Sequence, residues 1–209
     1  MAISSTPAPT KVPSPNKLAH VVLRTKDMPA MTKWYCDFLG GRIVHANPAI
    51  AFITYDDEHH RMAFVNIPGL QDKVRHSNGL EHISFTWDSL TDLVTAYKVR
   101  KVEQGIEPVW CVNHGLTTSL YYKDPDGNLL GLTVAVWTET QVDNLNNEES
   151  DALINSEDFA KNPVGIDFDP EELYEQVQRD GEEAVMERLR VRKDIGPRGI
   201  ESIPAAYMT

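Results

Sequence analysis

The sequence has little of several features that would place it in a familiar class. Its 209 residues include two cysteines, Cys36 and Cys111, too few for a disulfide framework or a cysteine-ligated zinc site. Both are predicted to be small core residues of a protein in a reducing compartment. Basic residues are also scarce, with 20 against 31 acidic ones and a formal net charge of −11. This balance argues against nucleic acid or an anionic membrane as a partner.

Other signals are missing as well. No apolar run approaches the roughly 20 residues of a membrane helix. There is no glycine-rich phosphate loop and no nucleophile elbow. Residues 1–16 are rich in Ser, Thr, Pro and Ala but contain neither arginine nor an apolar segment, so they fit neither a secretory signal nor a typical transit peptide. We interpret residues 1–16 as a disordered leader, and we expect a cytoplasmic protein.

One short stretch occurs twice. Residues 18–23 read Leu-Ala-His-Val-Val-Leu, and residues 80–85 read Leu-Glu-His-Ile-Ser-Phe. Each copy alternates like a strand and places its histidine, His20 or His82, at the same phase. A single histidine of this kind is most simply a hydrogen-bonded core residue. Two of them in a repeated unit indicate a paired metal site.

Each copy opens a unit with the order β-α-β-β-β. A helix-like segment follows each first strand; one begins at Asp27 and ends before Gly40, and the other ends at Gly105. The expected strands are 17–25, 42–46, 50–55 and 61–67 in the first unit, and 80–87, 108–112, 117–122 and one after the turn at 124–128 in the second. We predict an α+β fold in which two βαβββ modules, at about 17–69 and 79–145, form one cupped, eight-stranded mixed sheet.

The composition changes near residue 146, so we expect a domain at 17–145 and a C-terminal extension at 146–209. Residues 146–158 are acidic and polar and are predicted to form a loop. Asp169 and Pro170 then favour a helix start, and one helix is expected at about 170–193, although Gly181 can interrupt it. Its apolar face could dock on the main domain or on a second subunit.

The second unit contains the pattern Tyr-x-x-Asp-Pro-Asp-Gly-Asn, beginning at Tyr121. Two β-α-β-β-β units with a histidine on each first strand, followed by this turn, resemble the vicinal oxygen chelate superfamily of glyoxalases, bleomycin resistance proteins and extradiol dioxygenases. The sequence is most similar to extradiol ring-cleaving dioxygenases of the dihydroxybiphenyl type. The resemblance covers about residues 17–144, and the turn is a marker of the superfamily more than of one reaction.

In those dioxygenases two histidines and one glutamate bind Fe(II) on one face and leave the other positions open for substrate and dioxygen. The resemblance implies His20 and His82 as the first two ligands. It implies a glutamate seven residues after Asp124 as the third, but that position is Gly131.

An insertion would explain this departure. If residues 131–138 (Gly-Leu-Thr-Val-Ala-Val-Trp-Thr) are removed, Leu130 joins Glu139, and the sequence then closely resembles the end of the family's last strand. Eight residues of continuous strand would carry Glu139 roughly 26 Å away, at about 3.3 Å each. Glu139 can therefore be the third ligand only if the insertion bulges or lengthens the hairpin. We favour Glu139 as the ligand; the alternative is an exposed acid at a strand end.

Two further residues match positions that contact the substrate in the dioxygenases. His114 resembles the histidine that hydrogen-bonds a substrate oxygen, and Tyr121 resembles a substrate-facing tyrosine. The resemblance implies that they position the substrate and transfer protons. Tyr122 faces the other side of the strand. His59 and His60 lie in a polar turn, where they are either solvated or at the mouth of the pocket.

The predicted function is Fe(II)-dependent extradiol cleavage of a catechol-like aromatic ring, with Mn, Ni or Zn as alternative metals. The expected partners are a small aromatic substrate and dioxygen, and a homodimer is possible in this fold. One alternative is a metal-dependent lyase or isomerase of the glyoxalase type. Another is a non-catalytic small-molecule binding protein of the same fold. Phe52, Phe64 and Trp110 are expected to line an apolar cup.

Overall fold

The computed structural model describes residues 12–71, 80–127, 137–190 and 196–205. The first module contains β1 (Val21–Arg24), α1 (Met28–Leu39), β2 (Arg42–Ala46), β3 (Ile50–Thr54) and β4 (Met62–Val65). The second contains β5 (His82–Thr86), α2 (Leu90–Val99), η1 (Arg100–Gln104), β6 (Trp110–Asn113), β7 (Thr117–Lys123), η2 (Pro125–Gly127) and β8 (Trp137–Asp143). The predicted α+β class and the repeated βαβββ order are confirmed.

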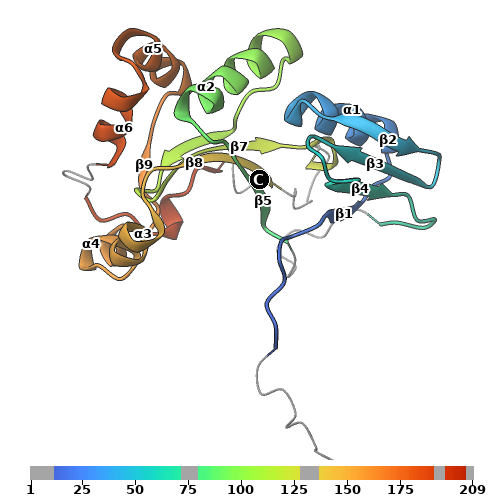
Figure 1. Cartoon of the computed structure of the whole chain (residues 1–209), viewed down its shortest axis with the longest axis horizontal. Coiled ribbons are helices and arrows are strands. Elements are labelled where there is room, and N and C mark those ends of the chain that lie inside the picture. Colours follow the sequence, from blue (N-terminus) through green and yellow to red (C-terminus); the bar gives the residue numbers. More distant parts are fainter. Residues whose placement is uncertain (1–11, 72–79, 128–136, 191–195, 206–209) are drawn as a thin grey trace, which may run out of the picture.

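Hydrogen bonding assigns one sheet to each module. The first has the order β1-β4-β3-β2, and the second has the order β5-β8-β7-β6-β9. In each module the first strand runs parallel to the last, and the other pairs are antiparallel, so both sheets are mixed as predicted. The helices α1 and α2 lie on the same side of the molecule, above the two sheets (Figure 1).

Local capping defines both module helices. The Asp27 side chain accepts a hydrogen bond from the Ala30 amide at 3.0 Å, and α1 ends at Gly40, whose φ of 63° is in the left-handed region. In the second module Ser89 caps α2, and Gly105 at φ 66° ends the helical segment after η1. Asp27, Gly40 and Gly105 are the cap and stops that the sequence predicts, which explains why these helix boundaries could be placed.

The two modules are joined by buried polar and aromatic contacts. In the Asp-Pro-Asp-Gly turn, Asp124 accepts a hydrogen bond from the Tyr35 hydroxyl at 3.2 Å, and Asp126 accepts one from Thr25 at 3.2 Å. Arg100 of η1 is 2% exposed and donates from Nε to the Phe38 carbonyl at 2.9 Å. Burial lowers the pKa of Arg100. The Asp-Pro-Asp-Gly turn thus has a structural role, because its two aspartates hydrogen-bond to residues of the first module.

The extension differs from its prediction in two places. Residues 146–158, predicted as a loop, contain α3 (Asn147–Ile154) and the start of α4 (Glu157–Lys161). Asn146 and Glu149 form a reciprocal capping box, which is why a polar segment becomes helical. The single helix predicted at 170–193 is instead two helices, α5 (Pro170–Asp180) and α6 (Glu182–Arg190), because Gly181 at φ 83° separates them.

Some of the predicted segments fall outside the described residues. Residues 1–11 of the predicted leader are among these, while 12–16 form neither helix nor strand. Residues 191–193 of the predicted helix are also outside the described part. The remaining elements of the extension are β9 (Ile166–Asp167), which pairs with β6, and η3 (Ile200–Ser202).

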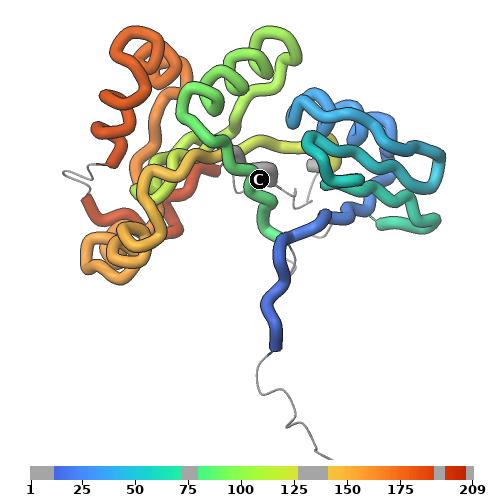
Figure 2. The backbone as a smooth tube through the Cα atoms, viewed as in Figure 1, coloured from blue at the N-terminus to red at the C-terminus, as the bar shows by residue number. Residues whose placement is uncertain are grey.

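The extension docks on the second module rather than standing apart from it. In the backbone tube, α5 and α6 lie beside α2 (Figure 2). Leu173, Val177 and Val185 are at most 5% exposed within the core of this module. Glu182 accepts hydrogen bonds from the first backbone amides of α2, at 3.1 and 3.2 Å. Among the residues described, no helix has both the length and the apolar character needed to cross a membrane.

Candidate active site

His20 and His82 lie at equivalent places in the two modules. His20 directly precedes β1, and His82 is the first residue of β5. Leu23 and Ile83 are buried, 8% and 9% exposed, whereas Val22 is 52% exposed. Alternation along the strands therefore puts both histidines on the sheet faces opposite the helix-covered core, as the sequence predicts.

His114 and Tyr121 form a hydrogen-bonded pair in the second module. His114 Nε2 lies 2.9 Å from the Tyr121 hydroxyl, and His114 Nδ1 lies 2.7 Å from the Val164 carbonyl oxygen. A carbonyl oxygen only accepts, so Nδ1 carries the hydrogen. In the neutral ring Nε2 is then the acceptor, and Tyr121 donates to it. The His82 ring stands edge-on to Tyr121 with centroids 5.9 Å apart, so these three predicted residues come together.

Trp110 supports this pair from β6. Its indole stacks on the Tyr121 ring at a centroid distance of 4.9 Å and an interplanar angle of 19°. The indole Nε1 donates to Asp167 Oδ1 at 2.8 Å. Trp110 lies on the strand face that carries Tyr121, but it does not line the cavity beside Tyr121 that was expected to be the cup. The sequence gives no sign that it stacks on Tyr121.

A cavity of about 440 Å³ opens beside these residues. One wall comes from the β5, β7 and β8 face with His82 and Tyr121, and the opposite wall comes from α3, α4 and the segment after them. The extension thus contributes directly to the candidate pocket. The cavity is lined by His82, His114, Leu116, Thr117, Tyr121, Gln141, Asp143, Leu145, Asn147, Ser150, Phe159 and Pro163.

The strand position of Glu139 is determined by its neighbours. In β8 it pairs with Tyr121 of β7 and with Ser84 of β5. Lys123 of β7 pairs with Trp137 of β8, and Gly131 lies among residues 128–136, which are outside the described part. Residues 137 and 138 of the proposed insertion belong to β8, and its residues 131–136 lie outside the described part. The side chains of residues 137–140 lie outside the described part.

The first module holds a separate group of rings. The His20 ring lies 4.4 Å from the His60 ring, and His60 stacks on Phe52 with centroids 4.6 Å apart. Nδ1 atoms of His59 and His60 are 2.6 Å apart. Desolvation, with the nearby charges of His20 and His59, lowers the pKa of His60. His20 is thus placed beside His60, while His82 is placed with the second-module residues.

One expectation about the cup is wrong. Phe64 is fully buried and contacts Tyr35 of α1 at a centroid distance of 5.2 Å. Phe64 pairs with Ala51, one residue out of phase with Phe52, so it faces the helix and not the cup. Phe52 lies on the open face beside His60, as expected.

Neither cysteine forms a disulfide. Cys111 is 7% exposed, and burial raises its pKa to about 12. Cys36 is half-buried, and burial raises its pKa as well. Within the described side chains, no three His, Cys, Asp or Glu groups are gathered as a metal site.

Sequence reasoning did not find the residues of the extension that reach this site. Val164 acts through its backbone carbonyl, which leaves no signal in the residue type. Asp167 and Arg198 meet across 31 positions of sequence, so no local pattern links them. The Asn146 capping box was a usable signal for α3 and hence for the second wall of the cavity.

Comparison with known proteins agrees with this architecture. Residues 17–132 match the family model of the glyoxalase/bleomycin resistance protein/dioxygenase superfamily. The chain is 43% identical to biphenyl-2,3-diol 1,2-dioxygenase 3 of Rhodococcus globerulus, over 76% of this chain and 80% of that protein. It is 42% identical to biphenyl-2,3-diol 1,2-dioxygenase 2 of the same organism, over 74% of this chain and 77% of the relative.

Among solved structures, a lactoylglutathione lyase from Agrobacterium tumefaciens is 17% identical, with a TM-score of 0.46, over 61% of this chain and 94% of that one. The family model spans more than half of the chain, and the two curated relatives match about three quarters of it. The chain belongs to the glyoxalase/bleomycin resistance protein/dioxygenase superfamily.

Proposed function

We propose that this protein is an extradiol-type dioxygenase that cleaves the ring of a catechol-like aromatic. The observation that carries the proposal is the Tyr121–His114 pair beside His82 at one cavity. The two relatives named as biphenyl-2,3-diol 1,2-dioxygenases support the same reaction class. A cavity of about 440 Å³ is in the size range of small-ligand sites.

Fe(II) is the metal we propose, with His20, His82 and Glu139 as its ligands. His82 opens β5, and Glu139 occupies a position on the adjacent strand two residues beyond the partner of His82. His20 is the equivalent histidine of the first module. Two imidazoles and one carboxylate suit Fe(II) in oxygenases, with open positions left for other ligands. Bound there, the metal would supply chelation of both substrate hydroxyls and a redox centre for dioxygen.

The protein's own groups would handle protons and orientation. His114 accepts from Tyr121 at Nε2, so the pair offers both a proton acceptor and a hydroxyl donor beside the cavity. A diol must lose a proton to chelate a metal. The Tyr121 oxygen would take that proton while the hydrogen of the Tyr121 hydroxyl passes to His114 Nε2. The Tyr121 hydroxyl would then hydrogen-bond to the developing negative charge.

The cavity lining fits a flat apolar ring that carries polar groups at one end. Leu116, Leu145 and Phe159 offer apolar surface, while Gln141 and Asp143 are polar. Phe159 and its neighbours come from the extension. We infer that α3 and α4 limit the size of the ring that can enter.

Two further properties belong to this proposal. We propose a cytoplasmic location, which fits two free cysteines in a reducing compartment. We also propose that two copies can pair through β2, an edge strand whose five residues are all exposed. Sedimentation or light scattering at several concentrations would detect such a dimer, and a monomer throughout would contradict it.

The test of function is ring cleavage of biphenyl-2,3-diol by protein reconstituted anaerobically with Fe(II). We expect one dioxygen consumed per diol, with both atoms of ¹⁸O₂ found in a ring-opened product. His82→Ala should abolish this turnover, whereas Arg188→Ala, which breaks an ion pair between α6 and Asp180 of α5, should not. Iron-loaded protein that consumes neither this diol nor catechol would contradict the proposal. Isomerisation of a hemithioacetal with Ni or Zn would favour the lyase alternative instead.

A further inference from the structure

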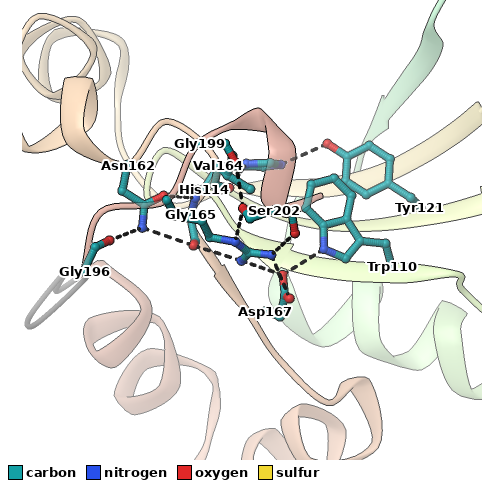
Figure 3. Close-up of polar contacts among 11 residues, drawn as sticks. Trp110, His114, Tyr121, Asn162, Val164, Gly165, Asp167, Gly196, Gly199 and Ser202 are labelled. Carbon is teal, nitrogen blue, oxygen red and sulfur yellow. Dashed lines mark hydrogen bonds and ion pairs between the residues drawn. The ribbon is translucent and has the colours of Figure 1, made fainter. Parts of the chain in front are cut away.

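The extension contains a network of polar contacts that ends at the proposed catalytic pair (Figure 3). We call residues 162–167 and 198–202 the extension bracket. Its central contact is a two-pronged ion pair, in which Arg198 Nη1 and Nη2 donate to the two carboxylate oxygens of Asp167 at 2.8 and 2.9 Å. The Arg198 side chain is 18% exposed and that of Asp167 is 49% exposed, so the pair lies at the surface with its arginine half largely covered. Bidentate pairs of this kind fix orientation as well as distance.

Asp167 connects the ion pair to the aromatic side chains of Trp110 and Tyr121. The same Oδ1 atom that receives Arg198 also accepts the Trp110 indole N–H at 2.8 Å. Trp110 in turn stacks on Tyr121. Trp110 and Tyr121 are 7% and 4% exposed, so neither ring can move without disturbing its neighbour. Through Asp167 and Trp110, the ion pair is thus linked to the Tyr121 ring.

The bracket also holds His114 directly. The Val164 carbonyl accepts the His114 Nδ1–H at 2.7 Å, which leaves Nε2 as the acceptor for Tyr121 in the neutral ring. If this carbonyl moved away, the opposite tautomer would become available. Nε2 would then carry a hydrogen and could no longer accept from Tyr121 or from a substrate hydroxyl.

The position of the Val164 carbonyl is itself fixed. Gly165 follows at φ 101°, and a Cβ there would lie 2.1 Å from the Asn113 carbonyl oxygen, so only glycine allows this close approach. Arg198 Nη1 donates to the Gly165 carbonyl at 3.2 Å. Asn162, 2% exposed, accepts from the Gly165 amide at 2.7 Å and donates to the Gly196 carbonyl at 3.1 Å.

We infer that the extension bracket sets the tautomer of His114 and the orientation of Tyr121, with Arg198 as its positioning residue. The importance of this for turnover rests on the proposed function. Its effect on the His114 ring does not, because the contacts belong to the protein alone.

The experiment compares wild type with Arg198→Ala and Arg198→Lys, using full-length ¹⁵N-histidine-labelled protein without added metal. Long-range ¹H–¹⁵N correlation at pH 8 reports which ring nitrogen carries the hydrogen, and His114→Gln assigns the signal. We expect His114 to be protonated at Nδ1 in wild type, with the second tautomer appearing in Arg198→Ala. Arg198→Lys should restore little of the wild-type tautomer, because lysine cannot make the two-pronged contact with Asp167. Arg188→Ala, which also removes an ion pair of the extension, should leave the signal unchanged.

Turnover is the second readout. With iron-loaded protein we expect Arg198→Ala to lower kcat by about 10–100-fold, because small displacements of catalytic groups are costly, with a smaller effect on KM. If Arg198→Ala does not fold, Asp167→Asn replaces it, since Asn keeps an acceptor for Trp110 but loses the ion pair. A wild-type tautomer in the variant would overturn the inference, whatever its activity. If wild-type protein shows no turnover but Arg198→Ala changes the His114 tautomer, the proposed function is refuted and the inference about the extension bracket is supported.

Discussion

Tyr121 and Tyr122 are neighbours on β7, so the same Tyr→Phe change at each should separate catalysis from stability. Tyr121 faces the cavity and bonds His114, whereas Tyr122 is fully buried against Phe38 with ring centroids 4.9 Å apart. Phenylalanine keeps each ring and its packing. The change therefore removes only a hydroxyl, on the site face in one variant and on the core face in the other.

The magnitudes follow from what each hydroxyl contacts. Tyr121→Phe removes one hydrogen bond of 2.9 Å beside a cavity, so the free energy of unfolding should fall by only about 0.5–1.5 kcal/mol. A positioned proton-transfer group contributes about 10²–10⁴-fold to a rate, so kcat should fall by at least about 100-fold. Tyr122→Phe should leave kcat within about twofold of wild type, since its hydroxyl lies away from the cavity.

The assay is oxygen uptake with biphenyl-2,3-diol, expressed per bound iron so that a change in metal content is not counted as a change in rate. Urea unfolding of the same samples measures stability. The reasoning would be refuted if Tyr121→Phe kept kcat within about twofold of wild type. It would also be refuted if the two variants lost equal activity.

Three further predictions test the packing and charges. At pH 8 the buried Cys111, with its pKa raised to about 12, should resist iodoacetamide in the native protein and react in urea, so alkylation of the native thiol would contradict its burial. Hydrogen bonding, chiefly from Lys98, lowers the pKa of Glu171 from 4.5 to about 2, so its stabilisation is complete above pH 4.5 and is lost as the pH falls towards 2. Glu171→Gln should therefore have a lower Tm than wild type at pH 6 and the same Tm near pH 2. Equal Tm values at pH 6 would contradict the stabilisation by ionised Glu171. Leu120→Ala, at a fully buried position, should reduce the free energy of unfolding by about 2–5 kcal/mol in urea, and a loss below about 1 kcal/mol would show that the site is not tightly packed.

The module architecture could be predicted because its signals are local. Helix α1 is bounded by Asp27 and Gly40, and the repeat containing His20 and His82 aligns the two units. Caps, stops and periodicity each depend on a few neighbouring residues, so they can be recognised without knowledge of the tertiary structure. The Asp124 turn then added the identity of the family.

The predictions were wrong where tertiary contacts determine the local structure or the direction of a side chain. Helix α3 has no buried residue, so it lacks the apolar stripe by which helices are recognised, and only the Asn146 capping box indicated it. The sequence alone predicts Phe64 in the cup, but the phase of β4 depends on its pairing with β3, which the sequence of the connecting turn does not specify.

The residues of the candidate site also fall into two groups, those that the sequence predicts and those that only the structure reveals. His82, His114 and Tyr121 were found through motif positions, and the structure brings them together. Val164 and Arg198 were not, because one acts through a backbone carbonyl and the other through an ion pair across the fold. Long-range polar contacts of this kind have no spacing that a single sequence could reveal.

The most direct test of the central claim is the Fe(II) affinity of anaerobically reconstituted protein, comparing wild type with Glu139→Ala and Asp143→Ala. Both acids are on β8, an even number of residues apart, and Asp143 lines the cavity, so it is the matched control. Loss of a group that only supports a metal ligand costs about 10–100-fold in affinity, so loss of a ligand should cost at least about 100-fold. The account predicts close to one iron per chain in wild type and Asp143→Ala, with a sharp loss in Glu139→Ala. Equal iron binding by Glu139→Ala and wild type would contradict it.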